Sequence, residues 1–345
     1  MGSNPIAATI AKSVEIRCNE FPLQSPLTPR VGFECRPRHD SISMKKLLLP
    51  ALALFSVSAA NAWDYTGHML VDQVAYENVS PRVRERVGKL VATIENKYND
   101  HQPYNFVTAG AWMDDMRSMP NYPWGPLHYV DAAYTPSGMP FVDPPPPNVL
   151  TAVADALATL KNKESTEEKQ SEALAMLLHM VGDMHQPLHC VDWNDKGGNG
   201  YFIYGIPFSD LGKKQIPNLH AFWDKSFRFD SQNDKIVELY RAPWPSDRPK
   251  STDSGLVHDE ALKIIAKYPK ASLEPLKLGQ PREWAMESHL IACIFAYPVR
   301  PHPTDAEVVT LTPDYVHQAH EIACERIAMG GYRLAALLED LFGKE

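Results

Sequence analysis

The sequence of 345 residues predicts a single, mainly helical domain over residues 63–345. Apolar residues recur at intervals of three and four along many segments, as they do through residues 173–181. One stretch, YFIYGIPF at 201–208, has the composition of a strand, and we expect it to form a hairpin. Because no repeat or composition break divides residues 63–345, the predicted fold class is all-α with one small β-hairpin.

Helical patterns fill most of the predicted domain, and two of them begin at a proline behind a capping residue, Pro81 after Ser80 and Pro313 after Thr312. In chain order, helices are expected at 67–79, 81–95, 106–116, 148–161, 167–184, 219–227, 235–241, 257–266, 282–295 and 313–341. The proline-rich stretch at 143–148 and the segment 242–254 are expected to be loops.

Residues 44–62 have the three parts of a secretory signal peptide: Lys45 and Lys46, an apolar run at 47–57, and Ala60-Asn61-Ala62 as the cleavage signal. The apolar run is too short to span a bilayer. We therefore expect cleavage after Ala62, a secreted or periplasmic bacterial protein, and no membrane span in the mature chain. Residues 1–43 are interpreted as a disordered, wrongly assigned upstream extension, with translation starting at Met44.

The charge of the chain excludes one class of nucleic-acid binder. The whole chain has a formal charge of −8. Residues 1–62 hold seven Lys or Arg and four Asp or Glu, so the mature chain keeps 27 basic and 38 acidic residues, a charge of −11. Such a chain is poorly suited to hold a polyanion through a basic field, so a phosphate-ester substrate would require metal cations.

Three cysteines remain after the expected cleavage. In an oxidising compartment Cys293 and Cys324 could pair, which would leave Cys190 free.

The densest motif is LLHMVGDMHQPLH at 177–189. His179 and Asp183 are four residues apart and so lie on one helix face. Pro187 ends the helix and lets His189 approach from the next loop. Imidazole and carboxylate groups that converge in this way suit zinc, although a lone His/Asp pair is also common as a hydrogen-bonded helix pair.

A second pair, His220 and Asp224, repeats this spacing in NLHAFWD at 218–224, behind Asn218 as a helix cap. Two such pairs favour a metal site over coincidence. With the further candidates His68, Asp114 and His128, the chain offers eight side-chain ligands, about the number that two or three zinc ions with open water positions require.

These motifs resemble those of the zinc-dependent, single-strand-specific nucleases of fungi and plants, the S-one and P-one type. The resemblance covers residues 63–345 and includes bacterial family members. Its motifs are Trp63 with His68, WMDDMR at 112–117, LHYVD at 127–131, HMVGDMHQPLH at 179–189, GGN at 197–199, NLHAFWD at 218–224 and GYRLAALL at 331–338. The implied fold is related to that of zinc phospholipase C.

Carried over residue by residue, the resemblance implies three zinc ions. One would be bound by Asp114, His128, His179 and Asp183, a second by Trp63, His68 and Asp183, and the third by His189, His220 and Asp224. Asp183 would bridge the first two ions. Trp63 would bind through its amino nitrogen and its carbonyl oxygen, which requires cleavage after Ala62.

The implied reaction is hydrolysis of single-stranded DNA and RNA to 5′-phosphonucleotides, with 3′-nucleotidase activity as an additional expectation. Arg117 would offset charge on the phosphoryl oxygens, and Asp183 would hold the catalytic zinc ions. Tyr129 is expected to stack on a base, with ordinary core packing as the alternative. Asp131 and Asn199 are the further candidates for substrate binding, and no stable protein partner is implied.

The chain also departs from the family pattern. Fungal members have an aspartate, paired with the basic residue, where this chain has Ala133, so another group must hold Arg117. Asp115 adjoins Asp114, and the W-x-D spacing favours Asp114 as the ligand. His185 is expected to face away from the zinc ions. The two glycines before Asn199 can also form a simple turn.

Two other functions compete with a nuclease. A zinc phospholipase C shares the three-zinc arrangement and an amino-terminal tryptophan. A non-catalytic periplasmic zinc-binding protein would use the same ligand types, but such proteins tend to close the coordination shell, and this ligand set leaves positions open.

Overall fold

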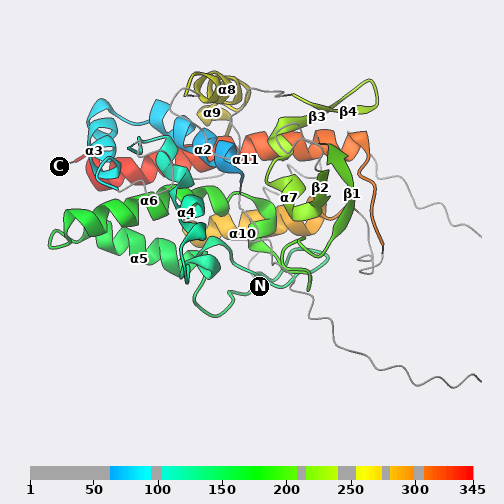
Figure 1. The fold of residues 1–345 in the computed structure, drawn as a ribbon, viewed down its shortest axis with the longest axis horizontal. Helices are drawn as coiled ribbons and strands as arrows, with labels where there is room; N and C mark the ends of the chain where they lie inside the picture. Colours follow the sequence, from blue (N-terminus) through cyan, green and yellow to red (C-terminus); the bar gives the residue numbers. More distant parts are fainter. Residues whose placement is uncertain are drawn as a thin grey trace, which may run out of the picture. The chain divides into compact units, whose positions relative to one another are not determined.

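A computed structural model of the protein describes residues 63–94, 103–207, 215–239, 254–273, 280–298 and 307–344. These residues all belong to one compact unit (Figure 1). The predicted signal peptide and upstream extension at 1–62, and residues 242–253 of the loop predicted at 242–254, lie outside the described residues. The last residue of that predicted loop, Ser254, is the first residue of α8.

The described residues are mainly helical, which confirms the predicted fold class. The helices are α2 (Tyr65–Glu77), α3 (Pro81–Val91), α4 (Trp112–Asp115), α5 (Val149–Lys161), α6 (Glu167–Asp183), α7 (Leu219–Trp223), α8 (Ser254–Lys267), α9 (Lys270–Leu273), α10 (Pro281–Ile291) and α11 (Pro313–Phe342). Short 3-10 turns include η1 (Thr108–Ala111), η3 (Gly125–His128) and η4 (Pro187–Cys190). In the described residues no helix is long and apolar enough to cross a bilayer.

Predicted helix starts agree with the capping interactions observed. The Ser80 side chain accepts from the Val83 amide, the Thr312 side chain from Tyr315, and the Asn218 side chain from Ala221. Each cap satisfies an amide that has no partner within its own helix.

The expected helix at 106–116 is broken into short turns, η1 and α4 among them. Its path passes so close to α2 that a Cβ on Gly110 would collide with the carboxylate of Asp72. The chain must hold glycine there, and glycine weakens a helix by about 1 kcal/mol relative to alanine.

The expected helix at 235–241 is wrong. Residues Lys235–Glu238 form strand β4, which pairs antiparallel with β3 (Phe229–Gln232). Asn233 and Asp234 join the strands with φ of 51° and 59°, a conformation that Asn and Asp tolerate and that two-residue hairpin turns require. Four residues are too few to show a helical or a strand periodicity. The turn residues Asn233 and Asp234 were the feature of the sequence that indicates a hairpin.

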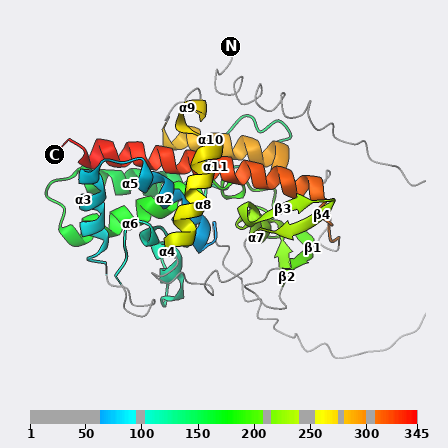
Figure 2. The ribbon, with the colours of Figure 1, turned by 90° about the horizontal axis from the view of Figure 1, so that it is seen from above.

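The predicted hairpin at 201–208 supplies strand β1 (Phe202–Pro207), which pairs antiparallel with β2 (Gln215–Asn218). β2 leads directly into α7, and Figures 1 and 2 show the two elements side by side.

Helices α2, α6 and α11 form the centre of the unit. The 30-residue α11, about 45 Å long, packs against α2, α8 and α6, while α5 packs against α6 (Figure 2). A Cβ on Gly331 would lie 2.4 Å from the Val74 Cβ, so this glycine permits the close contact between α11 and α2. The core therefore fixes α2 and α6, which carry His68, His179 and Asp183.

The three described cysteines are buried free thiols, so the pairing considered for Cys293 and Cys324 is not formed. Each of the two sulfurs instead lies beside the histidine four residues earlier in the chain. The Cys293 Sγ is 3.5 Å from His289 Nε2, and the Cys324 Sγ is 3.7 Å from His320 Nε2.

Candidate metal centre

The centre is organised around α6, whose last two turns carry His179 and Asp183. Both side chains are completely buried, and His179 Nε2 lies 3.3 Å from Asp183 Oδ2. His179 Nδ1 donates to the Gly110 carbonyl at 2.6 Å. Since a carbonyl can only accept, the proton of a neutral His179 is on Nδ1, and Nε2 presents a lone pair to the centre.

His128, at the end of η3, meets this pair from a distant part of the sequence. Its Nδ1 lies 3.0 Å from His179 Nε2 and 3.1 Å from Asp183 Oδ2. Its Nε2 lies 2.6 Å from the Tyr122 hydroxyl, which donates its proton to the Met113 carbonyl. The hydroxyl is then an acceptor for the His128 Nε2 proton, so Nδ1 also presents a lone pair.

His68 and Asp114 complete this part of the centre. His68 Nε2 is 3.4 Å from Asp183 Oδ1, and neither of these buried atoms has a hydrogen-bond partner. The His68 ring stacks on His179 with centroids 3.8 Å apart. Asp114 Oδ1 lies 3.9 Å from His179 Nε2. These residues form two groups that could each hold a metal ion. One consists of His68, Asp114 and His179, and the other of His128, His179 and Asp183. His179 belongs to both groups.

A third group consists of His189, His220 and Asp224, the three residues expected to act together. His189 Nδ1 donates to the His128 carbonyl at 2.7 Å, and His220 Nδ1 donates to the Gly197 carbonyl at 2.6 Å. The Nε2 atoms of these two histidines therefore face each other with lone pairs, 3.1 Å apart. Two such lone pairs repel unless a proton or a metal ion lies between them.

Two acidic residues of the centre, Asp183 and Asp224, have raised pKa values. Burial raises the pKa of Asp183 to about 6, although the nearby His179 opposes this shift. Burial also raises the pKa of Asp224 well above its usual value, despite the hydrogen bond from Gln186. The surrounding positive charge is too small to stabilise these buried carboxylates in their ionised form, and a bound metal ion would supply the missing charge.

The pKa values of the histidines shift in both directions. Burial and the neighbouring His179 hold the pKa values of His68 and His128 well below the usual range, so both side chains are neutral at pH 7. For His179, burial lowers the pKa, but the Asp183 and Asp114 carboxylates outweigh it and raise the pKa.

Arg117 points into the centre. Its Nε lies 2.6 Å from Asp114 Oδ1, and an amino group donates to His128 Nδ1 at 3.2 Å. The partner of Arg117 is therefore Asp114, three residues earlier, rather than a residue at the Ala133 position. Asp115 instead accepts from the Tyr104 hydroxyl at 2.7 Å, so the structure brings Asp114 and not Asp115 into the groups.

His185 faces away from the three groups, as expected. Its Nδ1 donates to the Val181 carbonyl, and its Nε2 accepts from Arg333 at 2.9 Å. Arg333 also makes two hydrogen bonds to Glu287, which a second buried arginine, Arg326, contacts. This network joins the end of α6 to α10 and α11.

Trp63 is completely buried near the first groups. A Cβ built on Gly182 would lie 2.7 Å from His68 Nδ1 and 3.6 Å from a ring carbon of Trp63, so the structure brings these two residues together beside Gly182. The amide of Asp64 donates to the Asp224 carbonyl at 3.0 Å, which ties the same segment to the third group.

The candidates for substrate binding lie farther out. Tyr129 is 36% exposed, which argues against ordinary core packing. Asp131 is exposed. The Asn199 side chain donates to the Lys196 carbonyl at 2.8 Å and closes the turn at Gly197 and Gly198, whose φ angles are positive, so the turn interpretation of this segment holds.

Two contacts of the centre were missed in the sequence. Tyr122 orients His128, and Gln186 donates to Asp224 at 2.7 Å. Gln186 stands inside the motif at 177–189, so its polar side chain between ligands was an available signal. Tyr122 had no such signal, since its position depends on the fold of residues 113–128.

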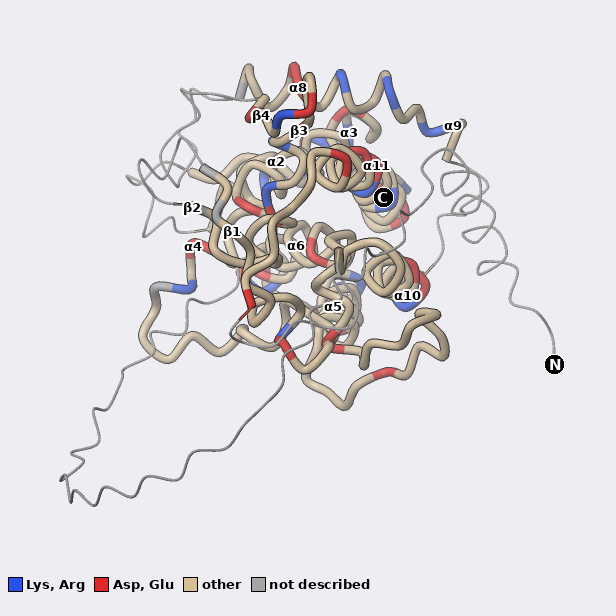
Figure 3. Tube along the Cα trace, turned by 90° about the vertical axis from the view of Figure 1, so that its right-hand side faces the viewer, with Lys and Arg blue, Asp and Glu red and all other residues tan. Residues whose placement is uncertain are grey.

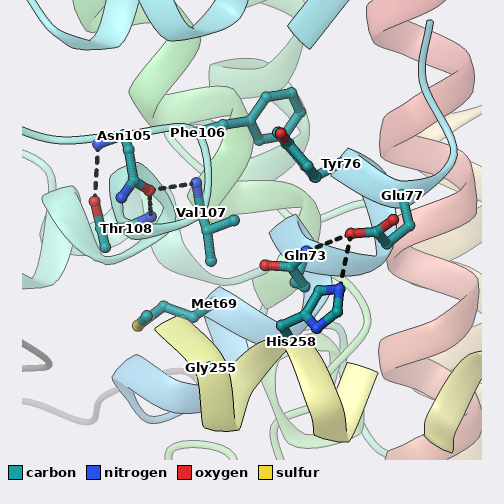
Figure 4. A pocket seen from close by; sticks show the side chains of 10 residues that line it. All are labelled: Met69, Gln73, Tyr76, Glu77, Asn105, Phe106, Val107, Thr108, Gly255 and His258. Atoms are coloured by element: carbon teal, nitrogen blue, oxygen red, sulfur yellow. Dashed lines mark hydrogen bonds and ion pairs between the residues drawn. The ribbon is translucent and has the colours of Figure 1, made fainter. Parts of the chain in front are cut away.

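A separate pocket of about 500 Å³ lies between α2, residues 105–108 and α8 (Figure 4). The rings of Tyr76 and Phe106 meet edge to face in it, and Glu77 accepts from Gln73 at 2.7 Å. His258 lies 3.6 Å from the same carboxylate oxygen. None of the predicted site residues lines this pocket, and its ionisable groups already pair with one another.

Comparison with known proteins finds relatives that are named as nucleases or endonucleases. The family model of the S1/P1 nucleases matches residues 63–343. Endonuclease 1 of Arabidopsis thaliana is 26% identical over 319 residues, which is 87% of this chain and 93% of the relative. Nuclease P1 of Penicillium citrinum is 25% identical over 299 residues, 82% of this chain and 99% of the relative. Endonuclease 3 of Arabidopsis thaliana is 25% identical over 83% of this chain and 91% of the relative.

Proposed function

This chain belongs to the S1/P1 nuclease family, and from that premise we propose that it is a zinc-dependent endonuclease that hydrolyses single-stranded DNA and RNA to 5′-phosphonucleotides. The observation that carries the zinc proposal is that histidine lone pairs face each other at two places in the centre, where Arg117 supplies a donor only to His128. His189 and His220 face each other at 3.1 Å, and His128 and His179 at 3.0 Å, while carbonyls and Tyr122 take their protons. Imidazole and carboxylate ligands in such groups suit zinc.

Three zinc ions would be held by the residues of the three groups. His128, His179, Asp183 and Asp114 would hold one, and His68 with Asp183 and the amino terminus at Trp63 a second. His189, His220 and Asp224 would hold the third. Zinc in such sites lowers the pKa of water towards neutrality and offsets charge on a phosphoryl group.

The chain's own residues prepare the centre for this chemistry. The backbone carbonyls of Gly110, His128 and Gly197 fix three histidine rings, so no reorganisation is needed when substrate arrives. Arg117 lies at the edge of the first groups, with its side chain 14% exposed. From there its guanidinium can reach a phosphoryl oxygen and offset its charge.

The segment ahead of Trp63 is part of this proposal. We interpret residues 44–62 as a signal peptide and residues 63–345 as the nuclease domain of a secreted or periplasmic protein. Support comes from the burial of Trp63 beside His68 and from the family match that begins at residue 63.

The decisive experiment compares three substrates with zinc-loaded protein. We expect hydrolysis of a single-stranded oligonucleotide with 5′-phosphorylated products, slow hydrolysis of the same sequence as a duplex, and no hydrolysis of a phosphatidylcholine analogue. Chelation of zinc should abolish activity, and zinc alone should restore it. Hydrolysis of the lipid alone would identify a phospholipase C, and no hydrolysis of any phosphate ester between pH 5 and 9 would identify a binding protein.

Zinc binding should weaken as pH falls below about 6. Because the pKa of Asp183 is raised to about 6, the metal-free protein carries a proton there at pH 5 that zinc must displace. The raised pKa values of Asp224 and His179 act in the same direction. Stability of the metal-free protein correspondingly decreases as pH rises from 4 to 6, by up to about 3 kcal/mol for Asp183.

Calorimetry of zinc-loaded and metal-free protein at pH 5 and pH 7 measures this effect. The difference in melting temperature between the two forms should be larger at pH 7. An equal difference at both pH values would show that these carboxylates do not compete with zinc for protons.

A further inference from the structure

Strand β1 carries aromatic side chains on its solvent face. From Tyr201 to Tyr204 the exposure alternates: Tyr201 and Ile203 are at most 3% exposed, whereas Phe202 is 41% and Tyr204 is 70% exposed. The register shifts at an irregularity between Phe202 and Ile206, and Ile206 is again buried. This alternation is that of a half-buried strand, in which the outward positions usually hold polar residues. Here both outward positions hold large rings.

The backbone beneath these rings is held on both sides. β1 pairs with β2 along one edge. On the other edge the Tyr204 amide donates to the Val309 carbonyl at 2.8 Å, and the Val309 amide donates to the Phe202 carbonyl at 3.0 Å. The neighbouring Val308 is 58% exposed. Phe202, Tyr204 and Val308 are called the aromatic face below.

The aromatic face adjoins the third metal group. Phe202 is paired with Asn218, which caps α7 two residues before His220. The Tyr201 carbonyl accepts from the Leu219 amide, and the Gly197 carbonyl accepts from His220. Figures 1 and 2 show β1 and β2 next to α7.

We propose that the aromatic face binds bases of a single-stranded nucleic acid whose cleaved phosphate lies in the metal centre, a proposal that rests on the proposed nuclease function. The chain has a formal charge of −8, and Figure 3 shows basic and acidic positions interspersed along the described trace. A strand therefore has to be held by contacts other than a basic field.

Stacking supplies those contacts. Every base has a π-face, so exposed rings hold a strand without sequence preference, and only unpaired bases offer both faces to a protein ring. The same rings would favour single strands over duplexes. A lipid surface fits less well, because the aromatic face adjoins the third metal group through Asn218 and α7, where the cleaved phosphate of a strand would lie.

The test is a length series of oligothymidylates from 2 to 16 nucleotides, cleaved by four proteins. These are the natural protein, F202T/Y204T, the ring-retaining F202Y/Y204F, and L256A/L262A, which removes two exposed apolar side chains from α8 instead. Threonine suits a strand, so the hairpin is retained. Melting temperature and zinc content serve as controls for folding.

For long oligonucleotides, F202T/Y204T should raise KM on the order of tenfold for each ring removed, with kcat unchanged. The defect should disappear for the dinucleotide, while F202Y/Y204F and L256A/L262A should match the natural protein at every length. Equal KM values at all lengths, or the same loss for the dinucleotide as for the 16-mer, would overturn the proposal. So would a loss of binding to phosphatidylcholine vesicles with unchanged oligonucleotide KM. If the natural protein cleaves no oligonucleotide, the proposed function fails instead.

Discussion

Replacing Asp183 by asparagine should remove two of the three zinc ions and lower nuclease activity by more than about a hundredfold. Asp183 lies within 3.4 Å of His68, His128 and His179, so its carboxylate is shared by the first two proposed zinc sites. The amide removes one negative charge and places an N–H donor beside His128 and His179, whose facing nitrogens are acceptors. Loss of a ligand should exceed the tenfold to hundredfold effect of residues that only orient ligands.

The measurement is zinc content by elemental analysis together with kcat/KM on a single-stranded oligonucleotide. Asp115→Asn is the matched control, because Asp115 is a buried neighbour of Asp114 that bonds to Tyr104 instead of the centre. It should keep three zinc ions. Full activity and full zinc content in Asp183→Asn would contradict the shared site.

Extra residues left ahead of Trp63 should remove one zinc ion and most of the activity. The second proposed site needs a free amine at Trp63, and a peptide nitrogen is a poor metal ligand. Extra residues would affect the centre directly, because they would be attached to Trp63. Trp63 is completely buried beside His68, and the Asp64 amide donates to the Asp224 carbonyl.

Two versions of the protein suffice for this experiment. One begins at Trp63, and the other carries a short leader that a protease can remove without leaving residues behind. Zinc content and activity should be low with the leader and return to the level of the first version after its removal. An unchanged zinc count with the leader present would rule out the amine as a ligand. The mass of protein secreted by a bacterial host tests cleavage after Ala62 directly.

Local geometry explains why much of the centre was predictable. His179 and Asp183, like His220 and Asp224, are paired by helical spacing alone, and their helices begin at recognisable caps, Thr166 for α6 and Asn218 for α7. The sequence patterns gave the wrong secondary structure in short segments, where a few residues fit more than one backbone conformation. The β4 segment was expected to be helical, and residues 106–116 are divided into short turns where Gly110 passes close to Asp72.

The sequence by itself determined the helical fold, the two histidine–aspartate pairs and the residue types that suit zinc. Only the tertiary structure decided how they combine. It brings His128 to Asp183 across 55 residues, selects Asp114 over Asp115, and shows that His179 belongs to two groups. It also directs the histidine protons towards backbone carbonyls and Tyr122. Helical spacing is a property of neighbours in the chain, whereas opposed lone pairs arise only when distant segments pack against one another.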